Sequence, residues 1–415
     1  MTLRQNWYPN LKMTITNETA IALIGLYCMA VVMGFGRFLF TATLPDIMNQ
    51  LTLSTATAGW LASINYIGYF FGALIAIFVP QRLTWQNLML WASISIVTTM
   101  LLFVPNMSLN LWYVIRLLAG IASGVAMILS SSLVIQYFSD ARRSVLSTIH
   151  YAGIGAGIST SAILTWVLLT LGYHFNVIWL MAGISSLPLL GLLYAIRPAQ
   201  TAARAQPRSI HQTYINFKRS LYEAIAGNTK AVILLSASYA LAGFGYITSA
   251  TFLPVIATQR LTEQSNSGLL IWLVVGLFAM LSNPLWGALA KRTGEIKTLL
   301  GLTLLQAVGM CMPMWFNGAL GLYGNAVIVG LTFAGIVSMT LIIIKNINPA
   351  YSNLLMGLAT LAYSVGQFIG PLVTVALAGA GDNFNAGLLV AGIGLLVSFI
   401  LLLWFRRQSP TNPLS

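Results

Sequence analysis

The sequence predicts an all-α membrane protein with twelve transmembrane helices in two pseudo-symmetric six-helix bundles. Charged residues make up 7% of the chain and hydrophobic residues 58%, whereas soluble domains carry roughly 25% charged residues. The chain also contains a series of apolar runs that are each long enough to cross a bilayer. Finally, residues 34–47 (GFGRFLFTATLPDI) return as residues 243–256 (GFGYITSATFLPVI). A long repeat within apolar sequence indicates two homologous halves.

Twelve apolar runs define the expected helices, six on each side of a polar central segment. In the first half they cover residues 19–45, 54–79, 86–104, 110–136, 144–170 and 175–197. In the second half they cover residues 230–257, 267–289, 296–314, 321–344, 352–379 and 384–404. Several runs contain glycine or proline, which membrane helices tolerate when neighbouring helices satisfy the freed backbone groups.

These runs divide the chain into five segments. We expect a cytoplasmic tail at 1–17, a six-helix bundle at 18–197, a cytoplasmic linker at 198–229, a second bundle at 230–407 and a cytoplasmic tail at 408–415. In the linker, apolar residues recur at helical spacing between Ile210 and Ile225. This pattern predicts an amphipathic helix on the membrane surface. A protein-binding segment is the alternative.

The positive charges predict the orientation. Of the 20 lysines and arginines, seventeen fall in the tails and in every second gap between runs, namely Arg4, Lys12, Arg82, Arg142, Arg143, Arg197, Arg204, Arg208, Lys218, Arg219, Lys230, Lys291, Arg292, Lys297, Lys345, Arg406 and Arg407. Only Arg260 falls in the remaining gaps, and Arg37 and Arg116 lie within runs. Under the positive-inside rule, both termini and the linker are therefore cytoplasmic. The positives lie in short gaps rather than in a basic patch, so we expect no nucleic-acid partner.

The chain resembles the major facilitator superfamily over nearly its whole length, through its two six-helix halves, long central loop and inside termini. The loop motif of that family, G-x-x-x-D-R-x-G, is similar to Gly287, Arg292 and Gly294, with Lys291 in place of the acid. In the first half the motif is reduced to Arg82. The resemblance implies that this loop helps to hold one conformation through charge pairs between the halves.

Two further matches narrow the resemblance. Arg116, Gly120 and Gly124 are similar to the R-x-x-x-G pattern of the fourth helix of the family, and GFGRF together with AGWLASINYIGYFFGAL (58–74) resembles its YbfB/YjiJ-type bacterial branch. The resemblance implies the major facilitator fold in a multi-pass protein of the bacterial cell inner membrane. It implies transport by alternating access but no particular substrate.

Arg37 is the first candidate for substrate binding, and the repeat places Tyr246 at the equivalent position. Arg37 lies eight residues before Pro45, or about 12 Å from the expected outer end of its helix. Arg116 lies six residues after Asn110, or about 9 Å from the outer end of the fourth helix. An arginine that faces lipid costs at least about 2.5 kcal/mol, so we expect both to face a cavity or a partner. The structural alternative is hydrogen bonding to neighbouring helices or snorkelling outward.

Buried acids are missing from the sequence. Of the seven acidic residues, only Asp46 adjoins an apolar run. Exporters of cationic drugs generally need a buried carboxylate to pair with the substrate. Two buried arginines without buried acids therefore predict a negatively charged small molecule as the ligand.

Other polar residues within the runs are candidates to line the substrate path. They are Asn65 and Tyr66 in the second run, Tyr246 in the seventh and Gln367 in the eleventh. For each of them, packing between helices is the alternative. His150 in the fifth run titrates near neutral pH and is a candidate for proton coupling. A neutral histidine hydrogen-bonded to the next helix is the alternative.

These features predict a monomeric secondary active transporter in the lipid bilayer. It would carry a small organic anion and be driven by an ion gradient, with the proton as the coupling ion. A proton-coupled multidrug or metabolite efflux transporter is the alternative. We expect no cofactor and no metal, because Cys28 and Cys311 have no partner ligands nearby in the sequence. No nucleotide-binding or catalytic constellation points to an enzyme.

Overall fold

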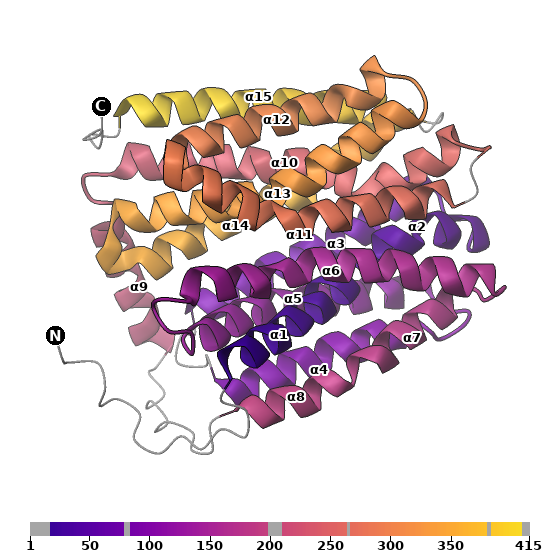
Figure 1. The fold of residues 1–415 in the computed structure, drawn as a ribbon, viewed down its shortest axis with the longest axis horizontal. Coiled ribbons are helices and arrows are strands. Elements are labelled where there is room, and N and C mark those ends of the chain that lie inside the picture. Colours follow the sequence, from indigo (N-terminus) through magenta and orange to yellow (C-terminus); the bar gives the residue numbers. More distant parts are fainter. Residues whose placement is uncertain (1–16, 79–83, 198–209, 264–265, 380–382, 409–415) are drawn as a thin grey trace.

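The structure is a computed structural model of the chain, and it describes residues 17–78, 84–197, 210–263, 266–379 and 383–408. Every regular element within these ranges is a helix, as the sequence predicts. The long helices run side by side along the longest axis of the molecule (Figure 1).

The helices of both halves follow the predicted apolar runs. The first half consists of α1 (Glu18–Met29), the π-helix η1 (Ala30–Phe38), α2 (Leu39–Gln50), α3 (Thr55–Phe78), α4 (Trp85–Leu101), α5 (Leu109–Ile135), α6 (Arg143–Thr170), α7 (Phe175–Ser186) and α8 (Pro188–Ile196). Then come α9 (Ile210–Ile225), α10 (Thr229–Arg260), α11 (Ser267–Thr293), α12 (Glu295–Trp315), α13 (Ala319–Ile347), the short 3-10 helix η3 (Pro349–Tyr351), α14 (Ser352–Ala378) and α15 (Asn385–Gln408).

Eleven helical stretches in the described residues are long and apolar enough to cross a membrane. One of them, Glu18–Gln50, joins α1, η1 and α2 and is 33 residues long. α4 falls outside this set because it has 17 residues, Trp85–Leu101, instead of covering the predicted 86–104. Turns follow Leu101, and Asn106 adopts a positive φ of 55°. The helix therefore ends before the apolar run does.

The first long helix continues past Pro45, so the boundary predicted at residue 45 is wrong. α2 ends at Gln50, and Leu44 and Ile47 on either side of the proline are buried. Proline removes one backbone donor, but a membrane helix tolerates this when neighbouring helices pack around it. Arg37 lies thirteen residues before Gln50, or about 20 Å from this end rather than 12 Å. It is therefore deeper than Arg116, which lies seven residues, or about 10 Å, from the start of α5.

The outside of the bundle is apolar. Large hydrophobic side chains on four different helices are about half exposed, namely Leu90 (53%), Val114 (51%), Leu281 (55%) and Ile400 (47%). Such a surface is unfavourable in water but matches the hydrocarbon of a bilayer, which supplies no hydrogen bonds.

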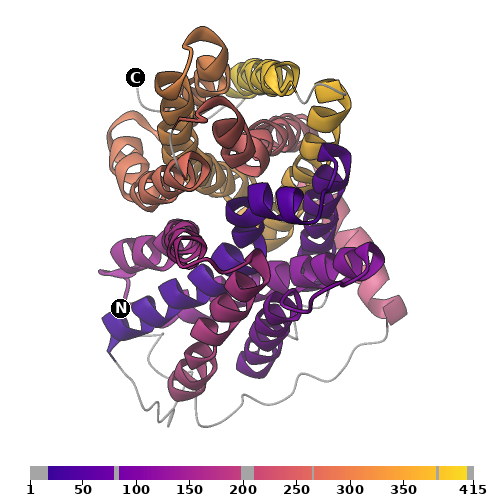
Figure 2. The same ribbon diagram turned by 90° about the vertical axis from the view of Figure 1, so that its right-hand side faces the viewer.

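The two halves of the sequence occupy two sides of the molecule. In Figure 1, α1 and α4 to α8 lie below α10 to α15, and in Figure 2 the two groups face each other across α2 and α3. The starts of α1 and α6, the end of α15 and the linker helix α9 lie at one end, which we call the termini face. The ends of α2 and α10, at Gln50 and Arg260, lie at the other end, which we call the opposite face.

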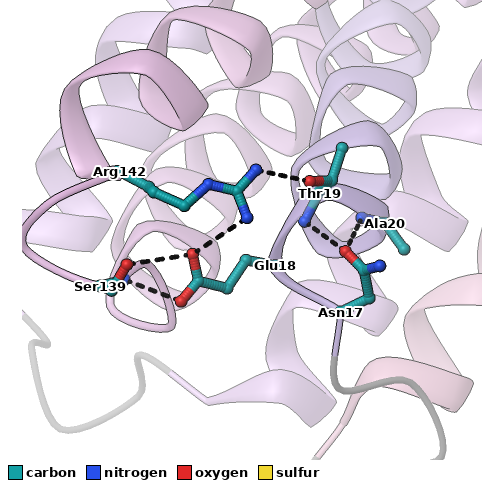
Figure 3. A network of polar contacts seen from close by, with 6 residues as sticks. All are labelled: Asn17, Glu18, Thr19, Ala20, Ser139 and Arg142. Atoms are coloured by element: carbon teal, nitrogen blue, oxygen red, sulfur yellow. Dashed lines mark hydrogen bonds and ion pairs between the residues drawn. The ribbon is translucent and has the colours of Figure 1, made fainter.

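A polar network holds the start of α1 at the termini face (Figure 3). The Glu18 carboxylate accepts hydrogen bonds from the Ser139 main chain and hydroxyl, both at 3.2 Å, and pairs with Arg142 at 3.8 Å. Arg142 also donates to the Thr19 hydroxyl at 2.8 Å. Exposed ion pairs of this kind stabilise a protein by at most about 1 kcal/mol. The network therefore positions the segment between α5 and α6 against α1 more than it stabilises the fold.

The structure has a helix, α9, where the sequence predicts one in the linker, although the side chains of residues 210–216 lie outside the described part. The Glu223 carboxylate accepts hydrogen bonds from the Tyr351 hydroxyl and from Arg219, the latter at 2.8 Å. These two bonds, with that from Tyr351 contributing most, lower the pKa of Glu223 below its usual value. Asn348 donates to the main-chain carbonyls of Glu223 and Ala224. The end of the linker helix is therefore anchored to the start of α14.

The residues of the predicted loop motif lie at the junction between α11 and α12. Gly287 and Arg292 are in α11, and Gly294 follows it with a φ of +84°. A positive φ favours glycine, because a Cβ would be strained there. No ion pair among the described residues includes Arg292. Arg82, the counterpart in the first half, lies outside the described residues.

Candidate substrate site

Arg37 lies in η1, where the first long helix changes from α to π geometry. The N–H of Leu39 bonds to the carbonyl of Gly34, five residues back, which defines a π turn. Gly34 packs so closely on α6 that a Cβ there would lie 2.4 Å from the Cα of Gly157. In the second half, the equivalent residues continue as a regular α-helix within α10. π segments occur frequently at functional sites. The difference between the two halves therefore points to η1, in the first half, as a candidate functional segment.

The Arg37 guanidinium is buried and lacks hydrogen-bond partners on one edge. Its side chain is 2% exposed, and neither Nε nor Nη2 has a hydrogen-bond partner among the described residues. None of the ion pairs that the described residues form includes it. The N–H bonds of these two nitrogens form the fork with which arginine binds a carboxylate through two parallel hydrogen bonds. The site therefore offers two donors to an anion.

Two tyrosines of α3 lie against this guanidinium. The Arg37 Cζ lies 4.7 Å from the ring centre of Tyr66 and 4.5 Å from that of Tyr69. A cation over an aromatic face gains about 0.5–2 kcal/mol, with the larger value where water is excluded. These contacts stabilise the charge without using its N–H groups, so the donors on the edge stay available.

The second half contributes a stack of aromatic rings opposite Arg37. Tyr246 on α10 lies nearly parallel to Phe333 on α13 and to Tyr363 on α14, with centroids 5.5 and 5.6 Å apart. Tyr239 continues the stack, 4.3 Å from Tyr363. Tyr66, which contacts Arg37, reaches α10 through its hydroxyl, 3.1 Å from that of Thr251. The helices that carry Arg37 and Tyr246 are therefore linked through Tyr66.

Gln367 on α14 is hydrogen-bonded to this aromatic stack. Its Nε2 donates to the Tyr246 hydroxyl, whereas its Oε1 is buried without a hydrogen-bond partner among the described residues. The side chain is 1% exposed. The site therefore combines two unpaired donors on Arg37 with one unpaired acceptor on Gln367.

Equivalent positions of the repeat touch beside this site. The Thr41 hydroxyl donates to the carbonyl of Ala250, at 3.0 Å and 209 positions away, which is the offset of the repeat. The Tyr66 hydroxyl lies 3.1 Å from that of Thr251. These two contacts join α2 and α3 to α10, which carries the second copy of the repeat. Arg37 lies one helical turn before Thr41, toward the termini face.

Arg116 and Asn65 serve mainly to join α3 to α5. The Nε of Arg116 donates to the carbonyl of Leu61 at 3.2 Å, and the amide of Asn65 donates to the carbonyl of Arg116 at 3.0 Å. The Arg116 guanidinium lies 4.2 Å above the ring of Phe40. The Nη1 of Arg116 and the Oδ1 of Asn65 are buried without a partner among the described residues. These contacts match the structural alternative better than ligand binding.

His150 lies far from Arg37. It packs against Gly25 of α1, where a Cβ would lie 2.3 Å from its Nδ1. Gly25 precedes Arg37 by twelve residues, or about 18 Å of helix. Neither ring nitrogen has a hydrogen-bond partner among the described residues, so the hydrogen bond of the structural alternative is not found. His150 meets Tyr151 edge-to-face, with centroids 5.1 Å apart.

A cavity of about 640 Å³ lies elsewhere, at the opposite face, and is lined by Gln259, Arg260, Pro313, Met314, Asn317, Gly318, Asn383, Phe384 and Asn385. Arg260 already donates to the carbonyl of Pro313 at 2.9 Å and to Asn385 at 2.6 Å. These bonds tie the ends of α10, α12 and α15 together. Arg260 therefore has hydrogen-bond partners for its guanidinium, whereas Nε and Nη2 of Arg37 have none among the described residues.

Sequence reasoning missed several aromatic members of the site, among them Tyr69, Tyr363 and Phe333. Helical spacing offered a signal for two of them. Tyr69 follows Tyr66 by three residues, and Gln367 follows Tyr363 by four, so each pair lies on one helix face. Phe333 carries no such signal.

Comparison with known proteins identifies the family. The family described as "Uncharacterised MFS-type transporter YbfB" matches residues 29–403 of this chain. The chain belongs to this family. It is therefore a membrane transporter of the major facilitator superfamily and not an enzyme, and the predicted resemblance is confirmed.

Individual relatives extend the comparison. An uncharacterised MFS-type transporter of Bacillus subtilis (strain 168), YceJ, is 25% identical over 390 residues, covering 92% of this chain and 94% of its own. A gallate transporter of Pseudomonas putida is 31% identical over 195 residues, which is 45% of this chain and 42% of the relative. A benzoate transport protein of Acinetobacter baylyi is 27% identical over 167 residues, or 39% and 35% of the two chains.

A solved structure supports the fold. The nucleoside transporter NupG, crystallised as a point mutant, superposes with a TM-score of 0.74 and covers 94% of this chain and 100% of its own. Sequence identity is 14%, so this likeness concerns the fold alone.

Proposed function

We propose that this transporter is a secondary active carrier of small organic anions, driven by an ion gradient with the proton as coupling ion. In this proposal α4 is the twelfth spanning helix, and residues 18–197 and 230–407 form two six-helix bundles. The bundles rock about the site at Arg37 and open it to one side of the membrane at a time. The carrier works as a monomer in a bacterial inner membrane.

The unpaired edge of Arg37 carries this proposal. A buried charge without a counter-charge is costly in a membrane, and such residues mark substrate paths. An anionic substrate would supply the counter-charge itself and accept two charge-assisted hydrogen bonds from Nε and Nη2. Exporters of cations need the opposite arrangement, in which a buried carboxylate waits for the substrate.

Two relatives that align with part of the chain are named for organic anions, which supports this class of substrate. Gallate and benzoate are both carboxylates, and the proteins named for them align with about two fifths of this chain. Contacts between repeat-related residues support the rocking motion, because Thr41 and Ala250 touch near the axis about which two equivalent halves can move.

A screen of metabolites tests the proposed class of substrate. The detergent-purified protein is heated with anionic, neutral and cationic compounds, since a ligand that binds the native state raises the melting temperature. We expect carboxylates to stabilise the protein. Stabilisation by neutral or cationic compounds alone would favour proton-coupled multidrug or metabolite efflux, the alternative function.

His150 is the proposed proton-coupling residue, because it is buried and titratable and both of its ring nitrogens lack a partner among the described residues. We expect His150→Gln to abolish gradient-driven uptake into proteoliposomes and to leave substrate exchange intact, because glutamine does not titrate. His174→Gln is the matched control, since His174 is exposed and bonds to Gln50. Normal gradient-driven uptake by folded His150→Gln protein would exclude this role, and failure to fold would assign His150 to packing.

The orientation follows from the distribution of positive charges and is tested with reporter fusions. Fusions after Asn49, Asn266 and Asn383 are expected to report a periplasmic position. Fusions after Ser139 and Gln212 are expected to report a cytoplasmic one. A periplasmic reporter at Gln212 would overturn the arrangement of the two halves.

A further inference from the structure

Resting on the proposed anion transport, we infer that the Arg37 site takes an aromatic carboxylate with a hydroxyl group on its ring. The carboxylate binds the Nε and Nη2 edge of Arg37. The ring packs against the aromatic stack of the second half, and the hydroxyl donates to Oε1 of Gln367. Each part of this assignment rests on a separate feature of the site.

The carboxylate end is defined by the geometry of the free donors. The unpaired nitrogens of Arg37 are the two that lie on one edge of the guanidinium, and they match the two oxygens of a carboxylate. Tyr66 and Tyr69 lie against the guanidinium, with ring centres 4.7 and 4.5 Å from Cζ, and neither is hydrogen-bonded to the two free nitrogens. An anion that uses both free N–H groups binds along the edge that carries them.

The aromatic body is indicated by the stack that starts at Tyr246. Its plane lies within 10° of that of Phe333 and 9° of that of Tyr363. Phe333 stands at one end of this stack of parallel rings, and offset stacking of a further ring on the end of such a stack is favourable. All three rings are buried, so a ligand stacked here would be enclosed by protein. A flat ring fits this stack better than a puckered aliphatic ring of equal size.

The ring hydroxyl is indicated by the unpaired acceptor. Buried polar atoms are nearly always hydrogen-bonded, and an exception calls for a partner. Gln367 already uses its Nε2 on Tyr246, which holds the side chain in place and leaves Oε1 free among the described residues. Of the groups that an aromatic acid can carry, a phenolic hydroxyl is a donor that brings no charge to this acceptor.

A ligand series on the unaltered protein tests the inference. Dissociation constants are measured by calorimetry for benzoate, 4-hydroxybenzoate, 3-hydroxybenzoate, 4-methoxybenzoate and cyclohexanecarboxylate. Of the two hydroxybenzoates, the one with the lower dissociation constant is expected to bind about 10-fold more tightly than benzoate, because it adds one hydrogen bond. 4-Methoxybenzoate lacks the hydroxyl donor, so it is expected to bind no more tightly than benzoate. Cyclohexanecarboxylate keeps the charge but not the flat ring, and is expected to bind about 5-fold more weakly than benzoate.

A variant then assigns the hydroxyl to Gln367. In Gln367→Leu the ratio of the benzoate and hydroxybenzoate dissociation constants is expected to fall from about 10 to about 1. Gln306→Leu is the matched control, because Gln306 is also buried with an unpaired Oε1 but donates to Thr332 instead of Tyr246. It should keep the ratio near that of the unaltered protein.

The outcomes separate this inference from the proposed function. Cyclohexanecarboxylate binding as tightly as benzoate overturns the aromatic assignment but leaves organic-anion transport standing. Methoxybenzoate binding as tightly as the hydroxybenzoates, or an unchanged ratio in Gln367→Leu, overturns the assignment of the hydroxyl. If no carboxylate in the series binds while other anions do, the inference alone fails. If no anion binds at all, the proposed function fails with it.

Discussion

Replacing Arg37 with alanine is expected to weaken the binding of an anionic substrate by roughly 10- to 150-fold. The substitution removes two charge-assisted hydrogen bonds, which contribute about 1.5–3 kcal/mol. It also removes the positive charge that lies against the rings of Tyr66 and Tyr69. The dissociation constant of the purified variant measures this loss directly, and uptake into proteoliposomes should fall with it.

Arg37→Lys separates charge from geometry. Lysine keeps the positive charge but presents a point charge in place of a fork, so it cannot reproduce the two parallel bonds of Nε and Nη2. We expect an intermediate affinity, weaker than the wild type and stronger than Arg37→Ala. Equal affinities for the lysine variant and the wild type would show that the fork is not used.

Arg37→Tyr is the control for folding. The second half carries Tyr246 at the equivalent position, where the tyrosine is buried among other rings. A buried tyrosine is therefore tolerated at the repeat-related position, although in α rather than π geometry, and the variant is expected to fold without binding the anion. Normal transport by folded Arg37→Tyr protein would contradict the anion site and leave Arg37 as a packing residue.

The repeat, the apolar runs and the position of Arg37 within one of these runs were all accessible from the sequence, because they depend on composition, periodicity and repetition. The end of the first helix was not. Pro45 breaks a helix in water, but in a membrane the packing of neighbouring helices determines whether the helix continues past a proline. Leu44 and Ile47 are buried by such packing, and the residues that pack there are distant in the sequence. The depth predicted for Arg37 was wrong for this reason.

The surroundings of Arg37 show the same limit. A single buried arginine without a nearby acid indicates an anion, but which helix faces cover it depends on the π turn at Gly34. That turn changes the direction of the side chains that follow it, and the repeated Gly243 lies in a regular α-helix. Sequence similarity between the halves therefore concealed a difference in backbone geometry.

The seam between α3 and α5 is held by backbone contact at two glycines. A Cβ at Gly120 would lie 2.0 Å from the carbonyl oxygen of Asn65 and 3.0 Å from the Cα of Gly68. A Cβ at Gly68 would lie 2.2 Å from the carbonyl oxygen of Leu117. The hydrogen bonds that position Arg116 run along the same seam. Small residues are what allow helix backbones to approach this closely in membranes.

Gly120→Ala is therefore expected to destabilise the protein, although alanine is the better helix former. Backbone atoms cannot rotate away as a side chain can, so α3 and α5 must separate along the seam. Overpacking of this kind costs about 1–3 kcal/mol or more, which lowers the melting temperature by several degrees in a chain of this size. Melting of the detergent-purified variant, followed by circular dichroism, measures the loss.

Gly301→Ala makes the same chemical change, but it is not expected to destabilise the protein. Gly301 lies within α12, and a Cβ there meets nothing within 4 Å among the described residues. Alanine in a helix interior is favoured over glycine by roughly 0.5–1 kcal/mol, so this variant should melt at or slightly above the wild-type temperature. Both variants add one methyl group to a helix. The difference between their melting temperatures therefore measures the effect of helix–helix contact apart from that of helix propensity. A Gly120→Ala protein that melts as high as Gly301→Ala would mean that α3 and α5 are not in backbone contact, and Arg116 would then lose the structural role assigned to it.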